Sequence, residues 1–543
     1  PLTVIRRFDC ILADTKQAVL DKYESVKQLP MQDILLRNAA GGLSFYNTSN
    51  FTFEKLLDDP DNIEANFREY LNGFSENVGE IIEKFKFDVH IETMASKGIL
   101  YIVLKEFTTQ KANLHPDVIS NLEMGYIFEE IIRRFSEAHN EDAGQHYTPR
   151  EVIKLMVNIL FHDDNDILSG NNVAKTIYDP ACGTGGMLSV AEEYLHELNK
   201  ATELIAFGQE LNDQTFAICK ADMLIKGSNA DFIKDGNTLS GDQFEGQAFD
   251  YILSNPPFGR EWKNEKNAVE MEAKRGFAGR FGAGLPAASD GQMLFLLTAL
   301  SKMKEPAQGG SRIAIIHNGS PLFTGDAGSG PSNIRKYVIE NDLLETIIAL
   351  PNDIFYNTGI ATYIWVLSNK KLGTKREGKV QLINANGLFE KRRKALGNKR
   401  NDIPESAIAE ITQLYGNFAK SEISKIFDNS DFGYTKITVE RPLCDENGKL
   451  ILKKGKKQAD SSLRDTESVP LKEDIGEYFK REVLPFAPDA WIDKNKSKVG
   501  YEIPFTRYFY KYEAPQPSSE IMAEILELEK DLDGALSEVF DNA

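Results

Sequence analysis

The sequence predicts an α/β protein built around a mostly parallel, doubly wound sheet, with helical segments before and after it. Between about residues 150 and 370, short apolar runs such as IAFGQE, FDYILSN and RIAIIHNG alternate with stretches of helical pattern. This alternation favours a sheet covered by helices on both faces. A glycine-rich turn, DPACGTGG, follows the apolar run KTIY, at the place where such sheets bring backbone close to a ligand.

The segments on either side of the sheet region predict helices. Residues 1–140 repeat apolar positions close to every 3.6 residues, as in VISNLEMGYIFEEIIRRFSEAHNE, so we expect an N-terminal helical domain there. Because the chain opens with Pro1 inside a helical pattern, we expect the natural start of this domain to be missing. We assign 141–390 to the sheet domain and 391–543 to a C-terminal region with a helical tail. The apolar stripe of the tail consists of Ile521, Ile525, Leu528, Leu532 and Val539.

The formal net charge of −19 is unfavourable for direct contact with nucleic acid, because an acidic surface repels phosphates on average. Binding to DNA therefore requires either a local basic region or a basic partner. One segment, EKRRKALGNKR, is strongly basic, and its cations are Lys391, Arg392, Arg393, Lys394, Lys399 and Arg400. These side chains could contact phosphates, or they could form an ordinary solvated face.

The cysteine pattern argues against disulfide bonds and metal sites. The four cysteines form neither a CxxC pair nor a cluster with histidine. We therefore expect no disulfide, no metal site and a reducing, cytoplasmic environment. Neither a run of 18 apolar residues nor a signal peptide is visible, so the sequence predicts no membrane segment.

Two acidic residues at strand ends accompany the glycine-rich turn. Asp179 leads the turn, and Glu210 ends the following apolar run, IAFGQE. A carboxylate at the second position can accept hydrogen bonds from both hydroxyls of a ribose. Glu210 follows Asp179 by 31 positions, which exceeds the roughly 20 of a dinucleotide fold. The pattern favours a nucleoside cofactor of another kind over a plain strand-to-helix turn.

The next apolar run, FDYILS, ends in the unusual sequence Asn255-Pro256-Pro257-Phe258. Prolines donate no backbone N–H, so their carbonyls are rigid acceptors. The Asn255 side-chain oxygen and the Pro256 carbonyl can accept two hydrogen bonds from one NH₂ group, and Phe258 offers a face for a planar base. We interpret the motif as a site that orients an aromatic amino group toward an electrophile. The alternative is a Pro-Pro strand stop beside a core phenylalanine.

The order of the motifs GQHYTPREV, DPACGTGG, GQE, GNTL and NPPFG resembles the modification (HsdM-like) subunits of type I restriction-modification systems, which are adenine-N6 DNA methyltransferases. Later blocks such as NDIFYNTGIATYIWVL, FGYTKITVERPL and IPFTRYFY extend the resemblance over nearly the whole chain. The resemblance implies the class I S-adenosylmethionine-dependent methyltransferase fold. It also implies methyl transfer from S-adenosylmethionine to N6 of an adenine flipped out of double-stranded DNA.

The resemblance also implies roles for individual residues. Glu210 holds the ribose of the cofactor, Asn237 and Thr238 flank its adenine, and no metal takes part. The target base is bound by Asn255, Pro256, Pro257 and Phe258. The remaining cofactor contacts, mostly at its methionine end, are Gln145, His146, Tyr147, Thr148, Pro149, Arg150, Asp179, Ala181, Gly183, Thr184, Gly185 and Gly186. His146 and Tyr147 stand where the family often has Phe, so either could be a packing residue.

The partners implied by the resemblance are double-stranded DNA and a separate specificity subunit, with two copies of this chain per specificity subunit. A restriction nuclease subunit is a possible third component. The C-terminal stripe would pair with helices of a partner, or pack back on its own domain. Residues 259–289 are rich in glycine and charge. They form either a loop that orders over the extruded strand or a disordered insertion.

Three rival functions remain open at this point. Similar NPP(F/Y) motifs occur in enzymes that methylate a glutamine amide or guanine N2 of ribosomal RNA, which are usually far shorter. The chain could also be a solitary adenine-N6 DNA methyltransferase of another defence system, although no added recognition domain is visible in the sequence. A cofactor-binding scaffold without turnover is the third alternative, and the intact Asn255–Phe258 motif argues against it.

Overall fold

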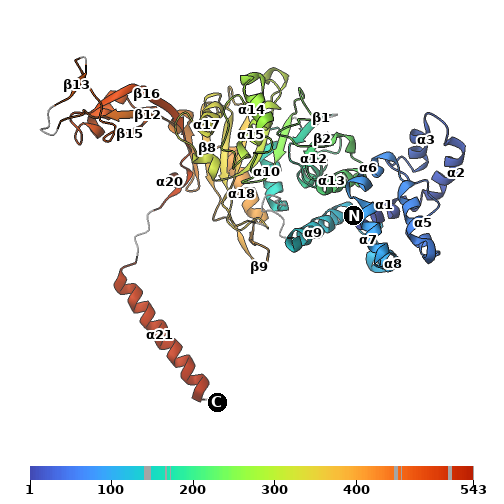
Figure 1. Ribbon diagram of the computed structural model, residues 1–543. Coiled ribbons are helices and arrows are strands. Elements are labelled where there is room, and N and C mark those ends of the chain that lie inside the picture. The colour runs from blue at the N-terminus through green and yellow to red at the C-terminus, as the bar shows by residue number, and fades with distance from the viewer. Residues whose placement is uncertain are drawn as a thin grey trace. The chain divides into compact units, whose positions relative to one another are not determined.

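The computed structural model describes residues 1–139, 148–164, 168–170, 173–356, 358–445, 450–453, 455–511 and 516–541. The chain divides into two compact units, Pro1–Ile503 and Pro504–Ala543. Figure 1 shows the helices and the sheet of the first unit, coloured from blue to orange. Among the described helices, none is long and apolar enough to cross a membrane.

Helices form the first part of the larger unit, as the sequence predicts (blue in Figure 1). Each turns an apolar face inward; α1, for example, buries Val4, Ile5 and Phe8 on one side. The helices are α1 Leu2–Leu12, α2 Lys16–Val26, α3 Gln32–Ala39, α4 Phe53–Leu56, α5 Ile63–Asn72, α6 Glu76–Lys84, α7 Phe87–Ser96, α8 Leu100–Phe107 and α9 Asn121–His139, with 3-10 turns at Pro60–Asn62 and Gln110–Ala112.

The central sheet has nine strands in the order β11-β8-β6-β7-β5-β4-β1-β2-β3. Only β7 and β11 run antiparallel to their neighbours, so the predicted mostly parallel α/β sheet is confirmed. The strands are β1 Ala174–Asp179, β2 Glu203–Glu210, β3 Ile233–Asp235, β4 Tyr251–Ser254, β5 Arg312–Asn318, β6 Leu344–Ala349, β7 Thr362–Ser368, β8 Lys379–Asn384 and β11 Ser424–Asp428.

The strand order reverses between β1 and β4. From β1 the chain adds β2 and β3 on one side, and it then returns to place β4 and β5 on the other side. The carboxyl ends of these strands diverge at such a reversal and leave a crevice, which is where open α/β sheets bind their ligands. The predicted cofactor turn follows β1, and the Asn255 motif follows β4, so the topology brings both to this crevice.

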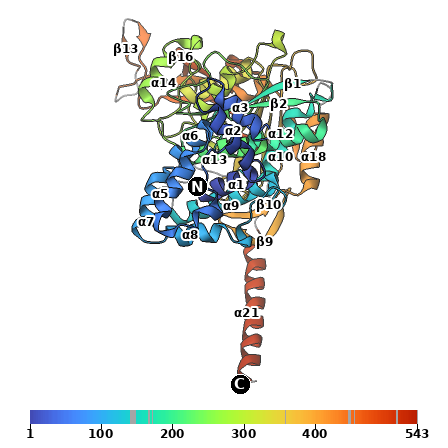
Figure 2. The ribbon, with the colours of Figure 1, turned by 90° about the vertical axis from the view of Figure 1, so that its right-hand side faces the viewer.

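Helices cover both faces of the sheet. In β5, Ala314 and Ile316 join the core shared with the N-terminal helices, while Ile313 and Ile315 are buried on the opposite face. Strands buried on both faces read as continuous apolar runs. Helix α10 packs between α12 and α18 (Figure 2). The covering helices are α10 Arg150–His162, α12 Gly186–Leu198, α13 Asp213–Lys226, α14 Lys266–Ala273, α15 Gln292–Ser301, α16 Ser320–Phe323, α17 Gly330–Glu340 and α18 Glu405–Asn417, with 3-10 turns at Ala230–Phe232, Gly276–Ala278 and Pro306–Gln308.

The helical domain is joined to the sheet domain through α6 and α13 (Figure 2). Lys220 of α13 forms an ion pair with Glu80 of α6. Lys84 Nζ lies 3.0 Å from Asp213 Oδ1 and also pairs with Asp235 at the end of β3. These contacts hold the N-terminal helices against the side of the sheet that carries β2 and β3.

The main sheet extends past the boundary predicted at residue 390. Strands β9 (Glu390–Leu396) and β10 (Lys399–Asp402) form a separate hairpin. After it, α18 packs on α10, and β11 pairs with β8 at the edge of the central sheet. The residues that follow the hairpin therefore complete the sheet domain.

A second, smaller sheet follows, which the sequence analysis did not predict for the C-terminal region 391–543. Its three antiparallel strands have the order β15-β12-β16. Ile437, Val439 and Val469 form a small core of their own with Phe479 and Val483. The elements are β12 Gly433–Glu440, β13 Leu452–Lys453, β14 Lys456–Lys457, β15 Asp465–Pro470, α19 Ile475–Tyr478, a π-helical turn Phe479–Val483 and β16 Trp491–Tyr501.

The second unit contains two helices, α20 Phe505–Phe509 and α21 Ser518–Asp541. Helix α21 confirms the predicted helical tail. Three residues of the predicted stripe, Ile521, Ile525 and Leu528, are exposed to solvent, and so are the neighbouring Met522 and Leu526. The side chains of Leu532 and Val539, which complete the predicted stripe, lie outside the described residues.

Candidate functional site

The ends of β1 and β4 are linked directly. Ser254, the last residue of β4, donates a hydrogen bond of 2.6 Å from Oγ to Asp179 Oδ1 at the end of β1. Ala181 N donates to the same oxygen at 2.9 Å. Both strands are parallel neighbours in the sheet, so the turn after β1 and the motif after β4 start from one fixed point.

Asp179 is buried, with 1 % of its surface exposed. Burial raises the pKa of its carboxyl group to about 7, although the hydrogen bonds from Ser254 and Ala181 act in the opposite direction. The negative charge of Glu210 raises this pKa further. A carboxylate in this position would be stabilised strongly by a cationic ligand, because desolvation penalises its charged form.

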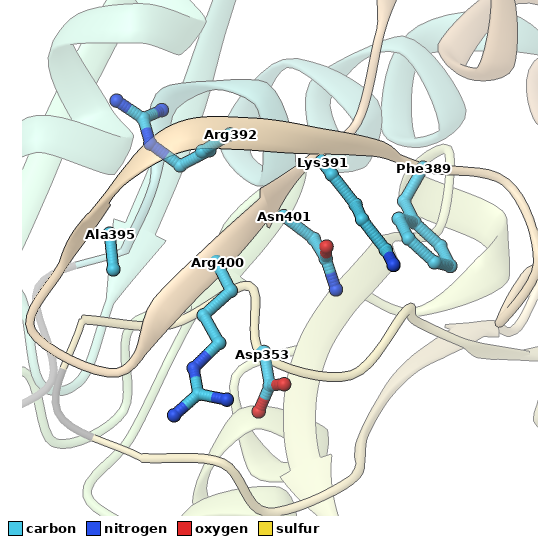
Figure 3. Close-up of a pocket in the computed structure, with 7 residues that line it drawn as sticks. All are labelled: Asp353, Phe389, Lys391, Arg392, Ala395, Arg400 and Asn401. Carbon is cyan, nitrogen blue, oxygen red and sulfur yellow. The ribbon is translucent and has the colours of Figure 1, made fainter. Parts of the chain in front are cut away.

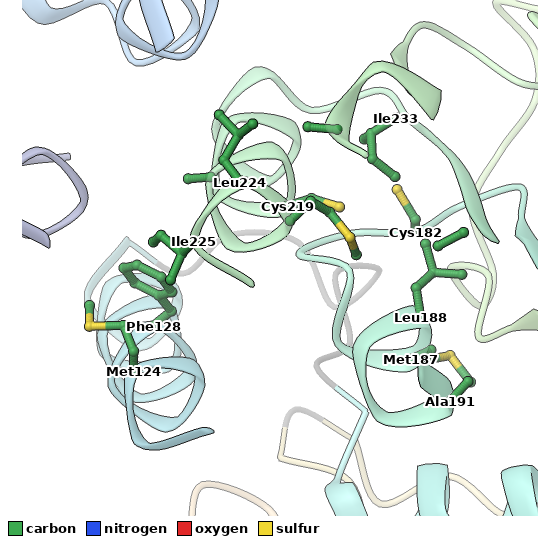
Figure 4. Packing of buried hydrophobic residues seen from close by; sticks show 14 of the residues in the cluster. Met124, Phe128, Cys182, Met187, Leu188, Ala191, Cys219, Leu224, Ile225 and Ile233 are labelled. Atoms are coloured by element: carbon green, nitrogen blue, oxygen red, sulfur yellow. The ribbon is translucent and has the colours of Figure 1, made fainter. Parts of the chain in front are cut away.

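The turn after β1 requires glycine. Gly183 and Gly185 have φ angles of 55° and 79°, in the left-handed region that favours glycine. A Cβ atom on Gly185 would lie 2.6 Å from Cys219 Sγ, so a side chain there would also collide with α13. Figure 4 shows Cys182, which belongs to the turn, and Cys219 of α13 among apolar side chains such as Leu188 and Ile233. The turn thus packs against an apolar cluster.

Glu210 ends β2 and faces the same turn. Its Oε2 accepts from Gly183 N and its Oε1 from Asn212 N, each at 2.8 Å. Burial raises the pKa of this carboxyl group, while the backbone hydrogen bonds lower it. A carboxylate offers about four acceptor positions, so both oxygens can accept further hydrogen bonds from a ligand.

The GNTL segment borders the turn on another side. Thr238 Oγ1 donates to Pro180 O at 2.5 Å. Asn237 Nδ2 donates to Glu265 Oε1 at 2.6 Å, and Asn237 Oδ1 accepts from Leu239 N at 3.0 Å. Both side chains that the resemblance assigns to the cofactor adenine are therefore held in place by other parts of the chain.

Asn255 follows β4, and only one of the two polar atoms of its carboxamide forms a hydrogen bond with a described residue. Its Nδ2 donates to Thr148 Oγ1 at 2.8 Å. Its Oδ1 is buried and has no hydrogen-bond partner within the described part of the chain. Leaving a buried acceptor unpaired costs about 1–3 kcal/mol. Such a cost at a strand end beside a ligand crevice points to a donor supplied by a ligand.

Comparison with known proteins agrees with this geometry. The family described as N-6 DNA Methylase matches residues 120–438, more than half of the chain. This chain belongs to the N-6 DNA methylase family. Residues 1–107 match the family described as HsdM N-terminal domain. The two matches confirm the predicted family, and they support S-adenosylmethionine as the cofactor.

The curated relatives that this chain matches share modest identity with it. It is 29% identical to the type I restriction enzyme MjaIX methylase subunit of Methanocaldococcus jannaschii, over 55% of this chain and 49% of that protein. It is 30% identical to the HindI methylase subunit of Haemophilus influenzae, over 48% of this chain and 54% of that protein. The chain thus spans about half the length of the curated relatives that it matches.

A solved structure shares the fold. The type I restriction-modification methyltransferase subunit from Streptococcus thermophilus superposes with a TM-score of 0.62 at 22% identity, covering 79% of this chain and 90% of that one. Its fold agrees with the class I methyltransferase architecture that the sequence predicts for this chain.

Phe258 is less accessible than the sequence suggests. Only 6 % of its surface is exposed. Its ring meets the ring of Phe355 edge to face, with centroids 6.3 Å apart and planes at 84°. A base could stack on Phe258 only after the neighbouring segment has moved, so the stacking role stays a prediction.

The predicted site residues divide into three groups. Gln145, His146 and Tyr147 lie outside the described residues. Pro149 and Arg150 start α10, where the Arg150 guanidinium lies 3.9 Å above the ring of Tyr126. The residues that the structure brings together around the ends of β1, β2 and β4 are Thr148, Asp179, Ala181, Gly183, Thr184, Gly185, Gly186, Glu210, Asn237, Thr238, Asn255, Pro256, Pro257 and Phe258.

The segment 259–289 is ordered and packs on the GNTL segment, so the predicted alternative of a disordered insertion is wrong. Arg280 donates to Thr238 O at 2.6 Å and to Leu239 O at 3.3 Å. The same guanidinium forms an ion pair with Glu272 at 2.7 Å. The sequence reading missed Arg280, Glu265 and Ser254; only Ser254 carries a sequence signal, because it immediately precedes Asn255.

The basic segment forms the β9–β10 hairpin. Lys399 is 1 % exposed and pairs with Glu151 and Asp402, so the idea that it contacts phosphates is wrong. Arg392 is bound to both oxygens of Asp402, at 2.6 and 2.7 Å. The four remaining cations are exposed and form no ion pair with any described residue; they are Lys391, Arg393, Lys394 and Arg400.

Proposed function

We propose that this protein transfers a methyl group from S-adenosylmethionine to the N6 amino group of adenine in double-stranded DNA, as the modification subunit of a type I restriction-modification system. The observation that carries the proposal is the buried, unpaired Oδ1 of Asn255, next to a glycine turn at the reversal of the strand order. The names of the curated relatives, type I restriction enzyme methylase subunits, support the same assignment.

The residues around the crevice fit the cofactor. The free acceptor positions of Glu210 suit the two ribose hydroxyls. The buried carboxyl group of Asp179 suits the ammonium group of the methionine end. Asn237 and Thr238 border the space next to the turn, where the adenine would lie. When bound, S-adenosylmethionine supplies an electrophilic methyl group.

Asn255 and Pro256 act on the target amino group. The adenine nitrogen is a weak nucleophile because its lone pair is delocalised into the ring. The two N–H groups donate hydrogen bonds to Asn255 Oδ1 and to the Pro256 carbonyl, which turns the lone pair toward the methyl group. They also stabilise the positive charge that develops on this nitrogen, which is where preorganised acceptors contribute most. Thr148 holds the Asn255 carboxamide in the orientation that presents Oδ1.

Base flipping is part of the proposal, because a paired adenine cannot bring its amino group to a buried acceptor. Phe258 would stack on the flipped base once its exposed surface has increased from 6 %. We expect this change on DNA binding, with displacement of the Phe355 ring that now contacts Phe258.

A separate specificity subunit would read the DNA sequence. The net charge of −19 opposes the phosphate field, so the chain needs help to bind DNA tightly. Helix α21 presents an exposed apolar row, Ile521, Ile525 and Leu528, which suits pairing with a helix of another subunit. Two copies of this chain per specificity subunit, and a nuclease subunit in the same complex, complete the proposed assembly. A solitary methyltransferase is the alternative.

Replacing Asn255 with Ala tests the proposed chemistry. The complex with the specificity subunit should bind S-adenosylmethionine with unchanged affinity, measured by calorimetry. Its kcat for methyl incorporation into DNA should fall roughly 100-fold or more, because the lost contact acts in the transition state. Thr148→Val removes only the group that orients the carboxamide, and it should lower kcat less. Methylation by the Asn255→Ala variant at the parent rate would disprove this role.

A further inference from the structure

The β9–β10 hairpin and the loop around Asp353 enclose a pocket. None of the residues that line it is among the predicted cofactor-binding or base-binding residues. The pocket has a volume of about 440 Å³. Figure 3 shows the Arg400 side chain beside Asp353, Lys391 between Asn401 and Phe389, and Arg392 pointing outward from the hairpin. The residues that line it are Asp353, Phe389, Lys391, Arg392, Ala395, Arg400 and Asn401.

The charge in this pocket is positive, in a protein whose net charge is strongly negative. Three cations line it against one carboxylate, that of Asp353. Arg392 is neutralised by Asp402. Lys391 and Arg400 are exposed, and neither pairs with a carboxylate among the residues that the structure describes. Two free cations beside one pocket suit an anionic ligand, and a phosphate is the anion that Arg and Lys bind together most readily.

The hairpin is fixed to the loop 352–356. Arg400 N and Asn401 N both donate to Asp353 O, at 2.8 and 3.2 Å. Asn401 Nδ2 donates to Asn352 O at 2.9 Å, and Asn398 N donates to Tyr356 O at 2.7 Å. Asp353 has a φ angle of 54°, which non-glycine residues rarely adopt. The buried pair of Lys399 with Glu151 anchors the hairpin to α10 as well.

The same loop reaches the proposed base site. Phe355, two residues from Asp353, is the residue whose ring meets Phe258 edge to face. The loop 352–356 therefore contacts the Asn255–Phe258 motif on one side and the basic hairpin on the other. A DNA strand that inserts its base at the motif would bring its own backbone close to the hairpin.

We propose that the pocket binds a backbone phosphate of the DNA strand that carries the target adenine, next to the flipped nucleotide. Lys391 and Arg400 contact the phosphate, while Lys399 and Arg392 are positioning residues that hold the hairpin. The proposal rests on the proposed function. In this proposal, the chain itself contacts the backbone of the strand that carries the flipped adenine, and the specificity subunit recognises the DNA sequence. Phosphate contacts position the DNA and carry no sequence information.

A pair of double variants on the same hairpin tests the pocket. Lys391→Gln/Arg400→Gln removes the two cations at the pocket, and Arg393→Gln/Lys394→Gln removes two exposed cations that do not line it. Both change the net charge equally. Each double variant is assembled with the specificity subunit. The complex is then titrated, at several salt concentrations, with a duplex that contains the site that the complex methylates. Cofactor affinity and melting temperature serve as controls for folding.

We expect the pocket variant to bind the duplex about tenfold more weakly, with a slope of log K against log[salt] that is smaller by about 0.9 for one lost phosphate contact. Cofactor affinity should not change. Neutral methylphosphonate at one phosphate beside the target adenine should weaken the parent complex and leave the pocket variant unaffected. The Arg393→Gln/Lys394→Gln control should behave like the parent in both measurements.

Two results would overturn the pocket assignment while leaving the proposed function intact. Equal losses in both double variants would show a diffuse basic surface. Normal DNA affinity and salt slope in the pocket variant would show that no phosphate binds there. In contrast, failure of the parent complex to methylate any adenine, with the cofactor bound, would refute the proposed function itself.

Discussion

Asp179 is the residue whose ionisation most directly concerns the site. Its pKa is raised from the ordinary value of 3.8 to about 7, mainly by burial. The folded protein therefore holds a proton on this group between about pH 4 and 7, where the unfolded chain does not. Because the folded state binds more protons in this window, the contribution of Asp179 to stability falls as the pH rises through it.

This shift predicts a pH dependence of cofactor binding. If Asp179 binds the ammonium group of S-adenosylmethionine, the proton must leave when the cofactor enters. Affinity at pH 6 should then be roughly tenfold weaker than at pH 8, and binding near pH 7 should release about half a proton. Calorimetry in buffers of different ionisation enthalpy measures both. Asp179→Asn should bind more weakly with no such pH dependence; an unchanged pH profile in that variant would place the ammonium elsewhere.

Contacts between single residues also show the limit of motif reading. The sequence places Thr148 with the cofactor contacts, but its hydroxyl accepts from Asn255 Nδ2. Ser254 stands next to the Asn255 motif in the sequence, but only the fold shows that its hydroxyl binds Asp179. Both contacts join segments that are 75 or more positions apart, so no local pattern could have indicated the partners.

At the scale of elements, the segment 259–289 supports the GNTL segment, where we propose that the cofactor adenine binds. Within residues 259–289, the Arg280 guanidinium makes most of the hydrogen bonds to the GNTL segment, donating to Thr238 O and Leu239 O. The Arg280 side chain is 9 % exposed, and its partner Glu272 is 19 % exposed. The hydrogen bonds and the charge of Arg280 lower the pKa of the Glu272 carboxyl group, against the effect of burial.

Arg280→Ala should therefore weaken both the fold and the site. We expect a loss of about 3 kcal/mol in the free energy of unfolding, because removing one partner leaves a largely buried carboxylate unpaired. Cofactor affinity should also fall, since Thr238 and Leu239 lose their support. Arg275→Ala, an exposed change in the same segment, is the matched control and should stay within about 0.5 kcal/mol of the parent. Denaturant titration and calorimetry measure the two effects, and equal behaviour of both variants would rule out this role for Arg280.

At the scale of the whole molecule, the acidic charge and the exposed row on α21 point to assembly. The isolated chain should bind DNA weakly and without sequence preference, because its net charge of −19 opposes the phosphates. Addition of the specificity subunit should produce site-specific binding and methylation of one adenine on each strand. Sequence-specific methylation by the isolated chain would favour the solitary alternative.

Removal of residues 518–543 should prevent this assembly and leave cofactor binding intact. A sharper variant replaces Ile521, Ile525 and Leu528 with Asp, which keeps the helix and removes its apolar face. Replacing Glu520 and Glu524 with Gln alters exposed positions of the same helix and serves as the control. Co-elution with the specificity subunit on size exclusion is the measurement. Normal co-elution of the triple Asp variant would exclude α21 from the interface.

Local patterns were sufficient to predict the α/β class, the helical N-terminal region and the helical tail. Burial on both faces of a parallel sheet produces continuous apolar runs, and a helix buried on one face has apolar residues about every 3.6 positions. Both patterns are therefore visible in the sequence. The glycine turn and the Asn255 motif were visible for a similar reason. Left-handed glycines and consecutive prolines have few structural uses, and each follows a recognisable strand.

The three-stranded sheet, the burial of Phe258 and the division of the basic segment were decided by tertiary contacts. Strands of the small sheet pair across long gaps, as β12 does with β16, and a short polar strand resembles a loop. Lys399 and Arg400 are neighbours of the same charge, yet one is buried against Glu151 and the other faces a pocket. Alternation along a strand sends adjacent side chains to opposite faces, and only the fold determines what each face meets.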